Sequence, residues 1–305
     1  MKVDIYQEVT NSIIELIEKN RTAKRSLWTN KDLSGMFPVN FKTKQPYSGI
    51  NILLLWARAE DMGFGSSYWL TFKQAQELGG TVKKGEKGTR CAYYGTYIKA
   101  GEGAQESKNA ISEGEDPKAS PFIKSFFLFN ADQIEGLELP ATVEKIPEEF
   151  MGNALAESIL QHSGAAILEG QSSRGGAYYV PSKDEIYLPS RESFITPSHF
   201  YSVALHELTH WTGHSSRLAR DFSGRFGTQS YAFEELVAEL GAAFLTSEIG
   251  AVNHTLPDHA GYIENWLKVL RNDKKAIFTA ASQASKAHRF ILDYLPKETT
   301  VTKAA

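Results

Sequence analysis

The 305-residue chain contains a single cysteine, Cys91, and no histidine before His162. One cysteine excludes an internal disulfide and fits a reducing compartment. No apolar run approaches the roughly 20 residues that a membrane-spanning helix needs, and the first eight residues lack the apolar core of a secretory signal. We therefore expect a cytoplasmic protein that does not associate with a membrane.

The distribution of charge, like that of histidine, differs between the first hundred residues and the rest of the chain. Residues 1–100 hold 15 Lys and Arg against 9 Asp and Glu, a net charge of +6. The remaining residues hold 18 against 27, a net charge of −9, together with all eight histidines. A chain of this length favours two domains. The asymmetry suggests that one of them faces nucleic acid while the other has a different role.

The spacing of apolar residues predicts an α+β protein whose first domain spans residues 1–140. The helices of this domain are predicted at 4–20, 51–59 and 71–78, and its strands at 89–99 and 122–130. The segment at about 100–120 is rich in Gly, Glu and Ser and predicts a mobile loop inside the domain. A proline and several charged residues predict a linker at 141–150.

The second domain, residues 151–305, is predicted to be mostly helical with a small β-sheet. A helix at 152–163 precedes a β-like stretch and a hairpin with strands at 178–180 and 185–189. Helices are then predicted at 198–213, 230–248 and 259–293, the last of them broken. The small sheet thus comes before the longest helices in the chain.

The predicted helix at 198–213 carries the H-E-x-x-H sequence His206-Glu207-Leu208-Thr209-His210. Positions i and i+4 lie on one face of a helix, so His206 and His210 can hold one metal ion. Glu207 is then placed as the catalytic base that takes a proton from an attacking water. Two imidazoles and a carboxylate favour Zn²⁺, with Mn²⁺, nickel or another divalent metal as the alternative.

A site of this kind needs a third protein ligand, and the predicted helix at 230–248 offers candidates. On a helical wheel, Glu235 and Glu239 lie together on one border of the apolar face, whereas Glu234 lies on the other. We predict Glu235 as the ligand and Glu239 as the carboxylate that orients a ligand histidine, with Glu234 as the alternative ligand. Ser216 stands where a metzincin has its third histidine, which argues against that class.

A solvated polar helix face is the plainest alternative to a metal site. Apolar residues flank Glu239 on both sides, and a buried carboxylate needs a partner, which favours the metal site. Tyr231 and His214 are candidates for stabilising the charge that develops on the attacked group.

Basic and aromatic residues are interleaved in the first domain. Binding of single-stranded DNA requires a positive groove with aromatic rings on which bases stack. The residues predicted to contact DNA are Trp28, Lys42, Lys44, Tyr47, Lys73, Lys83, Lys84 and Lys87. Further basic and aromatic residues in the same stretch are Trp69, Arg90, Tyr93 and Tyr94. Taken singly, each aromatic is equally compatible with a packing role.

The chain also resembles the ArdC-type antirestriction proteins, which are related to plasmid TraC-type primase proteins, along nearly its whole length. In the second half the resemblance is carried by 176–179, 184–189, 206–214, 217–218 and 231–244. In the first half it is carried by Pro38, Asn40, Thr43, Tyr47, 49–51, 55–56, 69–75 and 79–88. The segment 43–46 departs from the usual Thr-Gly-Lys pattern, and we expect this to alter a turn near the DNA surface.

This resemblance implies an antirestriction protein of a conjugative plasmid or related mobile element that binds incoming single-stranded DNA. It also implies a zincin-like metallopeptidase domain, for which a host protein is a candidate substrate. Two alternatives remain open. One is a cytoplasmic zinc metalloprotease without a nucleic-acid role, and the other is a DNA-binding protein with a purely structural metal site.

Overall fold

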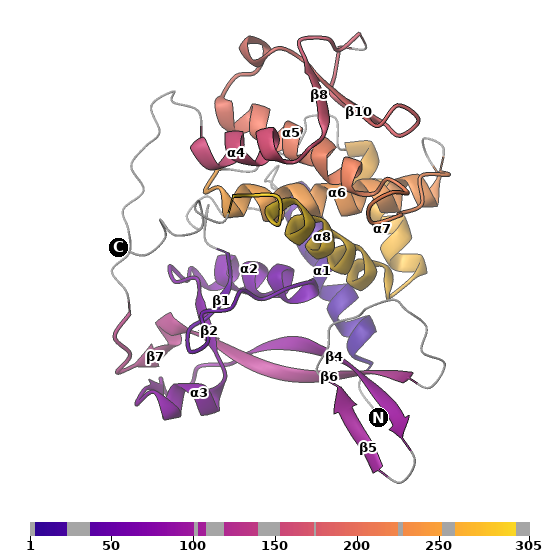
Figure 1. Cartoon of the computed structure of the whole chain (residues 1–305). Coiled ribbons are helices and arrows are strands. Elements are labelled where there is room, and N and C mark those ends of the chain that lie inside the picture. The colour runs from indigo at the N-terminus through magenta and orange to yellow at the C-terminus, as the bar shows by residue number, and fades with distance from the viewer. Residues whose placement is uncertain are drawn as a thin grey trace.

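A computed structural model describes residues 4–22, 37–100, 103–107, 119–139, 153–173, 175–224, 228–251 and 260–296. They form the predicted α+β fold, with the N-terminal sheet at one end and a small C-terminal sheet at the other (Figure 1). Trp28 and the predicted linker at 141–150 lie outside the described residues. Among the described helices, none combines the length and apolar character that a bilayer span requires.

The N-terminal half is built around a curved five-stranded sheet of order β1-β2-β6-β4-β5. Its strands are β1 (Val39–Asn40), β2 (Tyr68–Leu70), β4 (Thr89–Ala100), β5 (Gly103–Ser107) and β6 (Ala119–Asn130). The helices are α1 (Ile5–Thr22), α2 (Ile50–Met62) and α3 (Phe72–Glu77), and β3 (Thr81–Val82) pairs with β7 (Ile134–Glu135). The predicted helices and the two long strands are all present.

Strand β5 lies inside the segment at 100–120 that was predicted to be a mobile loop. It pairs antiparallel with the end of β4, from Thr96 opposite Ser107 to Ala100 opposite Gly103. The sequence of β5, Gly-Ala-Gln-Glu-Ser, has no alternation of large apolar residues that would mark a strand. Its strand geometry therefore follows from backbone pairing with β4 and has no signal in the side-chain pattern.

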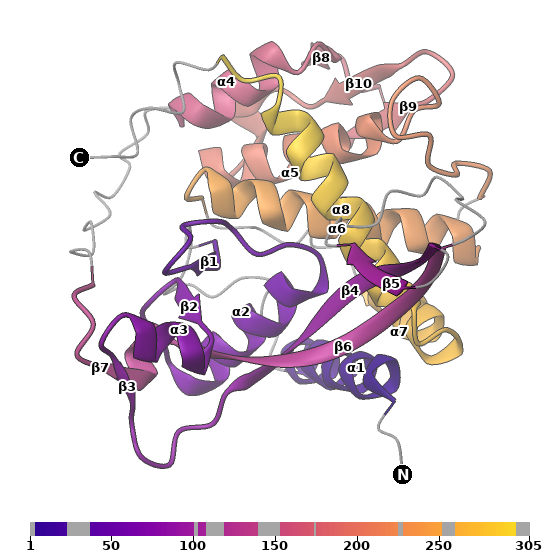
Figure 2. The same ribbon diagram turned by 60° about the horizontal axis from the view of Figure 1, so that its bottom comes forward.

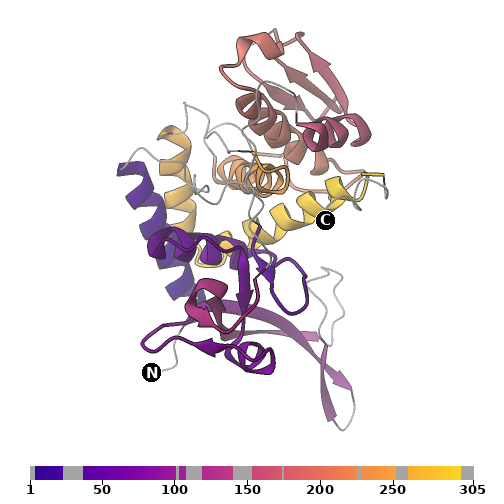
Figure 3. The same cartoon turned by 90° about the vertical axis from the view of Figure 1, so that its left-hand side faces the viewer.

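The C-terminal half places a small sheet and α4 (Ala154–His162) over a bundle of four helices (Figure 3). The sheet has the order β8-β10-β9 and consists of β8 (Ala166–Glu169), β9 (Tyr178–Val180) and β10 (Glu185–Leu188). The bundle consists of α5 (Pro197–Thr212), α6 (Gln229–Glu248), α7 (Ala260–Asn272) and α8 (Ala276–Leu292). The hairpin and the break in the last predicted helix are both present.

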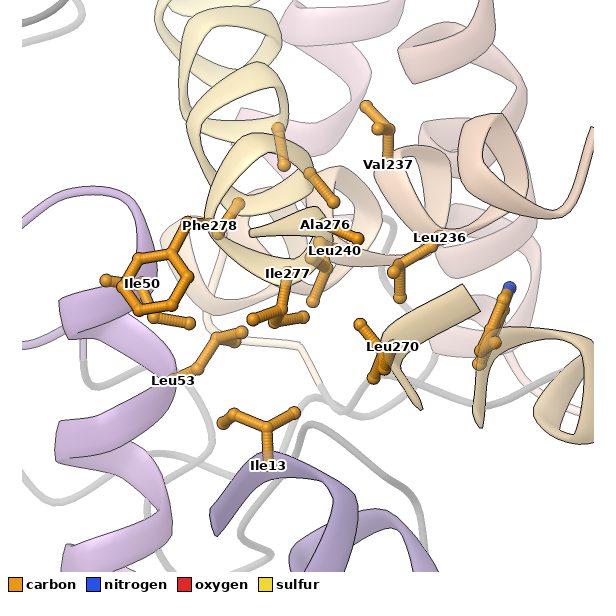
Figure 4. Packing of buried hydrophobic residues seen from close by; sticks show 14 of the residues in the cluster. Ile13, Ile50, Leu53, Leu236, Val237, Leu240, Leu270, Ala276, Ile277 and Phe278 are labelled. Atoms are coloured by element: carbon orange, nitrogen blue, oxygen red, sulfur yellow. The ribbon is translucent and has the colours of Figure 1, made fainter. Parts of the chain in front are cut away.

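The largest hydrophobic core is shared by the two halves of the chain. Ile13 of α1 and Leu53 of α2 pack in one cluster with Leu236 and Leu240 of α6 and Ile277 of α8 (Figure 4). All five side chains are at most 1% exposed. The domain limits 1–140 and 151–305 stay a prediction. The hydrophobic core is continuous across them, because residues of α1 and α2 pack in the same cluster as residues of α6, α7 and α8.

Helices α5 and α6 approach closely at Thr209 and Gly241. A Cβ added at Gly241 would lie 2.4 Å from Thr209 Cγ2 and 2.7 Å from its Oγ1. Real Cβ contacts are never so short, so the absence of a side chain at this position permits the crossing. The same crossing brings the H-E-x-x-H segment of α5 against the glutamates of α6.

Gly241→Ala is expected to lower the free energy of unfolding, although alanine is the better helix former by about 1 kcal/mol. Overpacking at a tight core contact costs about 1–3 kcal/mol, so the packing term outweighs the propensity term. Chemical denaturation of the two proteins measures the difference. Adding Thr209→Ala removes the two closest atoms, Cγ2 and Oγ1, and is expected to recover most of the lost stability. A single Gly241→Ala variant more stable than the parent would contradict the close crossing.

Candidate metal centre

Helix α5 begins with strong local signals and is then almost wholly buried. Thr196 caps it by accepting a hydrogen bond from the His199 N–H at 3.2 Å, and Pro197 occupies its first turn. Every residue from Phe200 to Thr212 is buried, including His206 at 4% exposure and His210 at 8%. Because two imidazoles at such depth require polar partners, the solvated-face alternative does not apply to this helix.

Glu235 of α6 faces both histidines. One of its carboxylate oxygens lies 3.5 Å from His206 Nε2, and the other lies 3.5 Å from His210 Nε2. Donor atoms of the three residues all lie within 4.8 Å of one another. Four tetrahedral ligands at about 2.1 Å from an ion are separated by about 3.4 Å, so the spacing fits a single small divalent cation.

The far nitrogen of each imidazole faces a second carboxylate. His210 Nδ1 lies 3.0 Å from Glu234 Oε1, and His206 Nδ1 lies 3.6 Å from Glu239 Oε2. A carboxylate behind a ligand histidine fixes the ring and its tautomer, and leaves Nε2 as the free donor. The structure therefore puts Glu235 within ligand distance and places Glu234 behind His210, outside the donor cluster.

Arg220 is the functional residue that sequence reasoning missed. Its Nε and Nη2 donate to the two oxygens of Glu234, each at 2.9 Å, and Nη2 also donates to the Thr209 carbonyl at 2.6 Å. The Arg220 and Glu234 side chains are 4% and 7% exposed. Arg220 follows the end of α5, where no periodicity applies, so only the folded loop reveals that it anchors the carboxylate behind His210.

The buried charges shift one another's ionisation. Burial lowers the pKa of His210, but Glu235 and Glu234 outweigh it and raise that pKa to about 9. Burial likewise opposes protonation of His206, whose pKa is nevertheless well above its ordinary value because Glu235 and Glu239 face it. Burial raises the pKa of Glu235, yet the two histidines bring it well below its usual range. The negative charge of the cluster thus favours either protonated imidazoles or a metal cation held by neutral imidazoles.

Glu207 lies at the wall of a cavity of about 360 Å³ that includes His206, His210 and Glu235. Burial raises the pKa of Glu207. The charges of His206 and His210, and to a smaller extent a hydrogen bond from the Tyr179 main chain, oppose that rise. Tyr178 and Tyr179 of β9, with Ala177 just before the strand, form another part of the wall. Glu207 is only 7% exposed, and it lines the same cavity as the donor cluster. Its carboxylate can therefore reach a molecule held in that cavity.

The β9–β10 hairpin is tied to the segment after α5. Asp184, in the hairpin turn, pairs with Arg217 and accepts a hydrogen bond from the Tyr179 hydroxyl at 2.8 Å. The Arg217 guanidinium also lies 3.8 Å from the centre of the Trp211 ring. These contacts connect the hairpin that carries β9 to the end of α5 and the segment that follows it. Tyr231 lines the cavity, whereas His214 contacts Ser216 at 2.8 Å and is not among the lining residues.

The predicted DNA-binding lysines lie around α3 and the neighbouring turns. The Nζ atoms of Lys42 and Lys73 lie 2.5 and 3.8 Å from the carboxylate oxygens of Glu77. The Lys73 side chain is 85% exposed. Lys44 Nζ lies 4.0 Å from the centre of the Phe41 ring, and Lys83 Nζ donates to the Asp132 carbonyl at 2.8 Å. Lys84 and Lys87 are exposed in the β3–β4 turn. The six lysines therefore remain in contact with solvent.

Two of the aromatics considered for stacking are engaged in the fold. Trp69 is 2% exposed and belongs to the core beneath the sheet, so its suggested role as an exposed stacking residue is wrong. Tyr47 is half-buried, and its hydroxyl accepts a hydrogen bond from Asn40 Nδ2 at 2.9 Å. Burial raises the pKa of Tyr47 to about 12. Neither ring is presented freely to a base.

Exposed phenylalanines near the lysines were not anticipated. Phe72 of α3 is 50% exposed and Phe127 of β6 is 48% exposed. The Phe129 ring, on the same face of β6 as Phe127, lies 6.2 Å from that of Phe72. Alternation along β6 places residues 127 and 129 away from the buried Leu128. The sequence analysis predicted a strand at 122–130, and the alternation along this strand was the signal that could have identified the exposed rings.

Residues 154–283 match the family of zincin-like metallopeptidases, and residues 3–129 match the N-terminal domain of the anti-restriction factor ArdC. An uncharacterized protein of Sinorhizobium fredii, y4eC, is 36% identical over 93% of this chain and 90% of its own length. The DNA primase TraC of Escherichia coli is 35% identical over 98% of this chain, which spans only 28% of that protein.

The antirestriction ArdC protein from the R388 plasmid is similar in structure as well as in sequence. Its metal-free crystal structure has a TM-score of 0.76 at 35% identity, covering 96% of this chain and 98% of that chain. Its Mn(II)-bound structure has a TM-score of 0.73 at 34% identity with the same coverage. Identity and coverage at this level, over both halves and in one order, place the chain in the ArdC family of antirestriction proteins.

Proposed function

We propose that this protein is an antirestriction factor of a mobile element that binds single-stranded DNA and contains a metal-dependent hydrolytic centre. The observation that carries the second part is the convergence of two histidine Nε2 atoms on one carboxylate, at 3.5 Å each. Zn²⁺ suits two imidazoles and a carboxylate. The Mn(II)-bound relative makes manganese the alternative occupant.

The side chains have distinct parts in the chemistry. A divalent ion, when bound, polarises a carbonyl oxygen and lowers the pKa of a water. His206, His210 and Glu235 hold that ion, while Glu234 and Glu239 keep the two imidazoles in orientation. The Glu207 carboxylate takes the proton from the attacking water and returns it to the leaving group.

Glu207→Gln is expected to keep metal content and stability and to abolish hydrolysis, because an amide of the same shape cannot accept the proton. Loss of a general base lowers the rate by about 10²–10⁴-fold. Cleavage of a denatured protein substrate measures hydrolysis, and plasmid transfer into a restricting host measures antirestriction. The substrate assay must first show metal-dependent cleavage by the parent. Unchanged cleavage by the variant would contradict the assigned role, and unchanged antirestriction would separate hydrolysis from the phenotype.

The surface around α3 supports the proposal of DNA binding. Phe72 is exposed beside Lys73, and its ring lies 6.2 Å from that of Phe129 on β6. Lys84 and Lys87 are exposed in the β3–β4 turn, and Phe127 continues the aromatic face on β6. Cationic groups neutralise phosphates, and an exposed ring supports a base of any sequence. The association suits a strand whose bases are unpaired, and requires no reading of base edges.

Phe72→Ala is expected to weaken binding of a labelled oligothymidylate by about tenfold, since one stacked base contributes about 1–3 kcal/mol. The combined variant Lys73→Glu/Lys84→Glu/Lys87→Glu is expected to weaken it further and to flatten its salt dependence. Fluorescence anisotropy at several salt concentrations measures both. Tyr294→Ala, an equally exposed aromatic at 45%, and Lys183→Glu are the matched controls. Full binding by the Phe72 and lysine variants would contradict this surface.

A further inference from the structure

Helix α8 of the C-terminal half crosses near β4 of the N-terminal half (Figure 2). A cavity of about 320 Å³ at this junction is lined by residues of α8, β4 and the start of α2. We propose that it binds one nucleotide unit, and that α8 of the C-terminal half therefore takes part in DNA binding. The inference rests on the proposed binding of single-stranded DNA and assigns it a second site. This cavity is separate from the metal centre, with which it shares no lining residue.

Contacts between the halves fix the shape of the cavity. The Gly49 N–H, at the start of α2, donates to Ser285 Oγ of α8 at 2.8 Å. Phe278 of α8 packs edge-on against Tyr6 of α1 and Tyr94 of β4, with ring centres 5.0 and 5.7 Å apart. The walls thus belong to elements that are locked together through the shared core, so the cavity is formed before any ligand arrives.

The charge of the lining is entirely positive. Lys275, Lys286 and Arg289 line the cavity, and its lining includes no Asp or Glu. Within the part of the chain that the structure describes, neither Lys286 nor Arg289 pairs with a carboxylate. Helix α2, which is 13 residues long, begins at this wall with no acidic residue in its first turn. Its N–H groups add to the positive potential, and together these groups select an anion such as a phosphate.

A second part of the lining is aromatic. Tyr93 of β4 and Phe126 of β6 line the cavity, and both residues are half-buried. Ser48 and Gln283 add hydrogen-bonding groups at the margin. The volume lies at the lower end of the range of about 300–1,000 Å³ typical of small-molecule sites. A ligand that combines a phosphate with a flat ring satisfies both parts of the lining, and a nucleotide is that ligand.

A nucleotide bound in this cavity would stabilise helices that also carry the proposed metal ligands. A nucleotide held between β4 and α8 contacts both halves and so stabilises their junction. Helix α8 packs along α6, which carries Glu235, through Ala280 and Ala284 in the shared core. A strand bound here would thus reinforce the same helices that position the metal ligands.

The test compares two double charge reversals in the full chain. Lys286→Glu/Arg289→Glu alters the cavity, whereas Lys183→Glu/Lys268→Glu reverses two exposed lysines elsewhere. Anisotropy of a labelled oligothymidylate at low salt is expected to show at least about tenfold weaker binding for the cavity variant, with a flatter salt dependence, and less than about twofold change for the control. Thermal unfolding with and without thymidine monophosphate tests the free nucleotide, which is expected to stabilise the parent more than the cavity variant.

The outcomes separate this inference from the proposed function. Loss of oligonucleotide affinity in the cavity variant supports a strand as the source of the nucleotide, and loss of stabilisation by the monophosphate supports a free nucleotide. If the parent binds DNA and the cavity variant matches the control in both assays, the inference is overturned while DNA binding stands. If the parent binds neither ligand at low salt, both the inference and the proposed DNA binding fail. Equal melting temperatures without ligand show that the variants are folded.

Discussion

Replacing Glu235 by glutamine is expected to lower the affinity for Zn²⁺ or Mn²⁺ by at least about 100-fold. The change removes the negative charge that faces both Nε2 atoms at 3.5 Å and leaves two imidazoles and a weakly binding amide oxygen in this cluster. Loss of a carboxylate that only orients a ligand lowers metal affinity by about 10–100-fold. Loss of a ligand itself is therefore expected to lower the affinity more. Calorimetric titration of metal into chelator-treated protein measures the affinity.

Two further variants make this experiment decisive about the ligand. Glu248→Gln alters a carboxylate at the far end of the same helix and is expected to bind metal as the parent does. Glu234→Gln is expected to weaken binding less than Glu235→Gln, because Glu234 contacts Nδ1 of His210 rather than the donor cluster. A Glu234→Gln variant that loses metal while Glu235→Gln keeps it would show that the alternative ligand was the correct one.

Arg220→Met is expected to lower the free energy of unfolding of the metal-free protein by about 3–5 kcal/mol. The methionine fills similar volume but removes the two guanidinium hydrogen bonds to the buried Glu234 carboxylate and leaves His210 as its remaining partner. Breaking a buried ion pair costs about this much. Both side chains of the pair are at most 7% exposed, so solvent cannot replace the arginine. Chemical denaturation measures the loss. Metal affinity is also expected to fall, because Glu234 loses the group that holds it against His210.

Arg191→Met provides the matched control. Arg191 also pairs with carboxylates, those of Glu157 and Glu169, but its side chain is 40% exposed. Exposed pairs contribute about 0–1 kcal/mol because water screens and replaces them. A loss of stability in Arg220→Met no greater than that in Arg191→Met would show that the buried pair does not support the site as described.

The local parts of the metal centre could be predicted because they follow helix geometry. His206 and His210 share a face by their spacing, and the wheel placed Glu235 beside Glu239 on the next helix. The relation between the two helices could not be predicted, because it depends on the contact between Thr209 and Gly241, which are far apart in the sequence. That crossing decides that Glu234 faces Nδ1 of His210. The part played by Arg220 depends on a loop, where no periodic pattern exists.

The same limit applies to the fold. Apolar periodicity located α1 and α2 but could not show that Ile13 and Leu53 complete the core around Leu236. A helix with one apolar face can pack against any partner of suitable shape, so the sequence carries no direct record of which helix covers which. Charge and composition suggested two parts with separate roles. Because the core is shared, the residues proposed for these two roles lie in one packed body, with α6 common to the candidate metal centre and to the junction.

A crystal structure of the protein soaked with Mn²⁺, with anomalous data at the manganese edge, tests the metal centre most directly. The account predicts one strong anomalous peak per chain, bound by Nε2 of His206, Nε2 of His210 and a carboxylate oxygen of Glu235, with Glu207 close to an open coordination position. Glu234 and Glu239 should remain against the Nδ1 atoms. A peak held by Glu234 instead, or an empty site at saturating metal with ions bound elsewhere, would contradict the account.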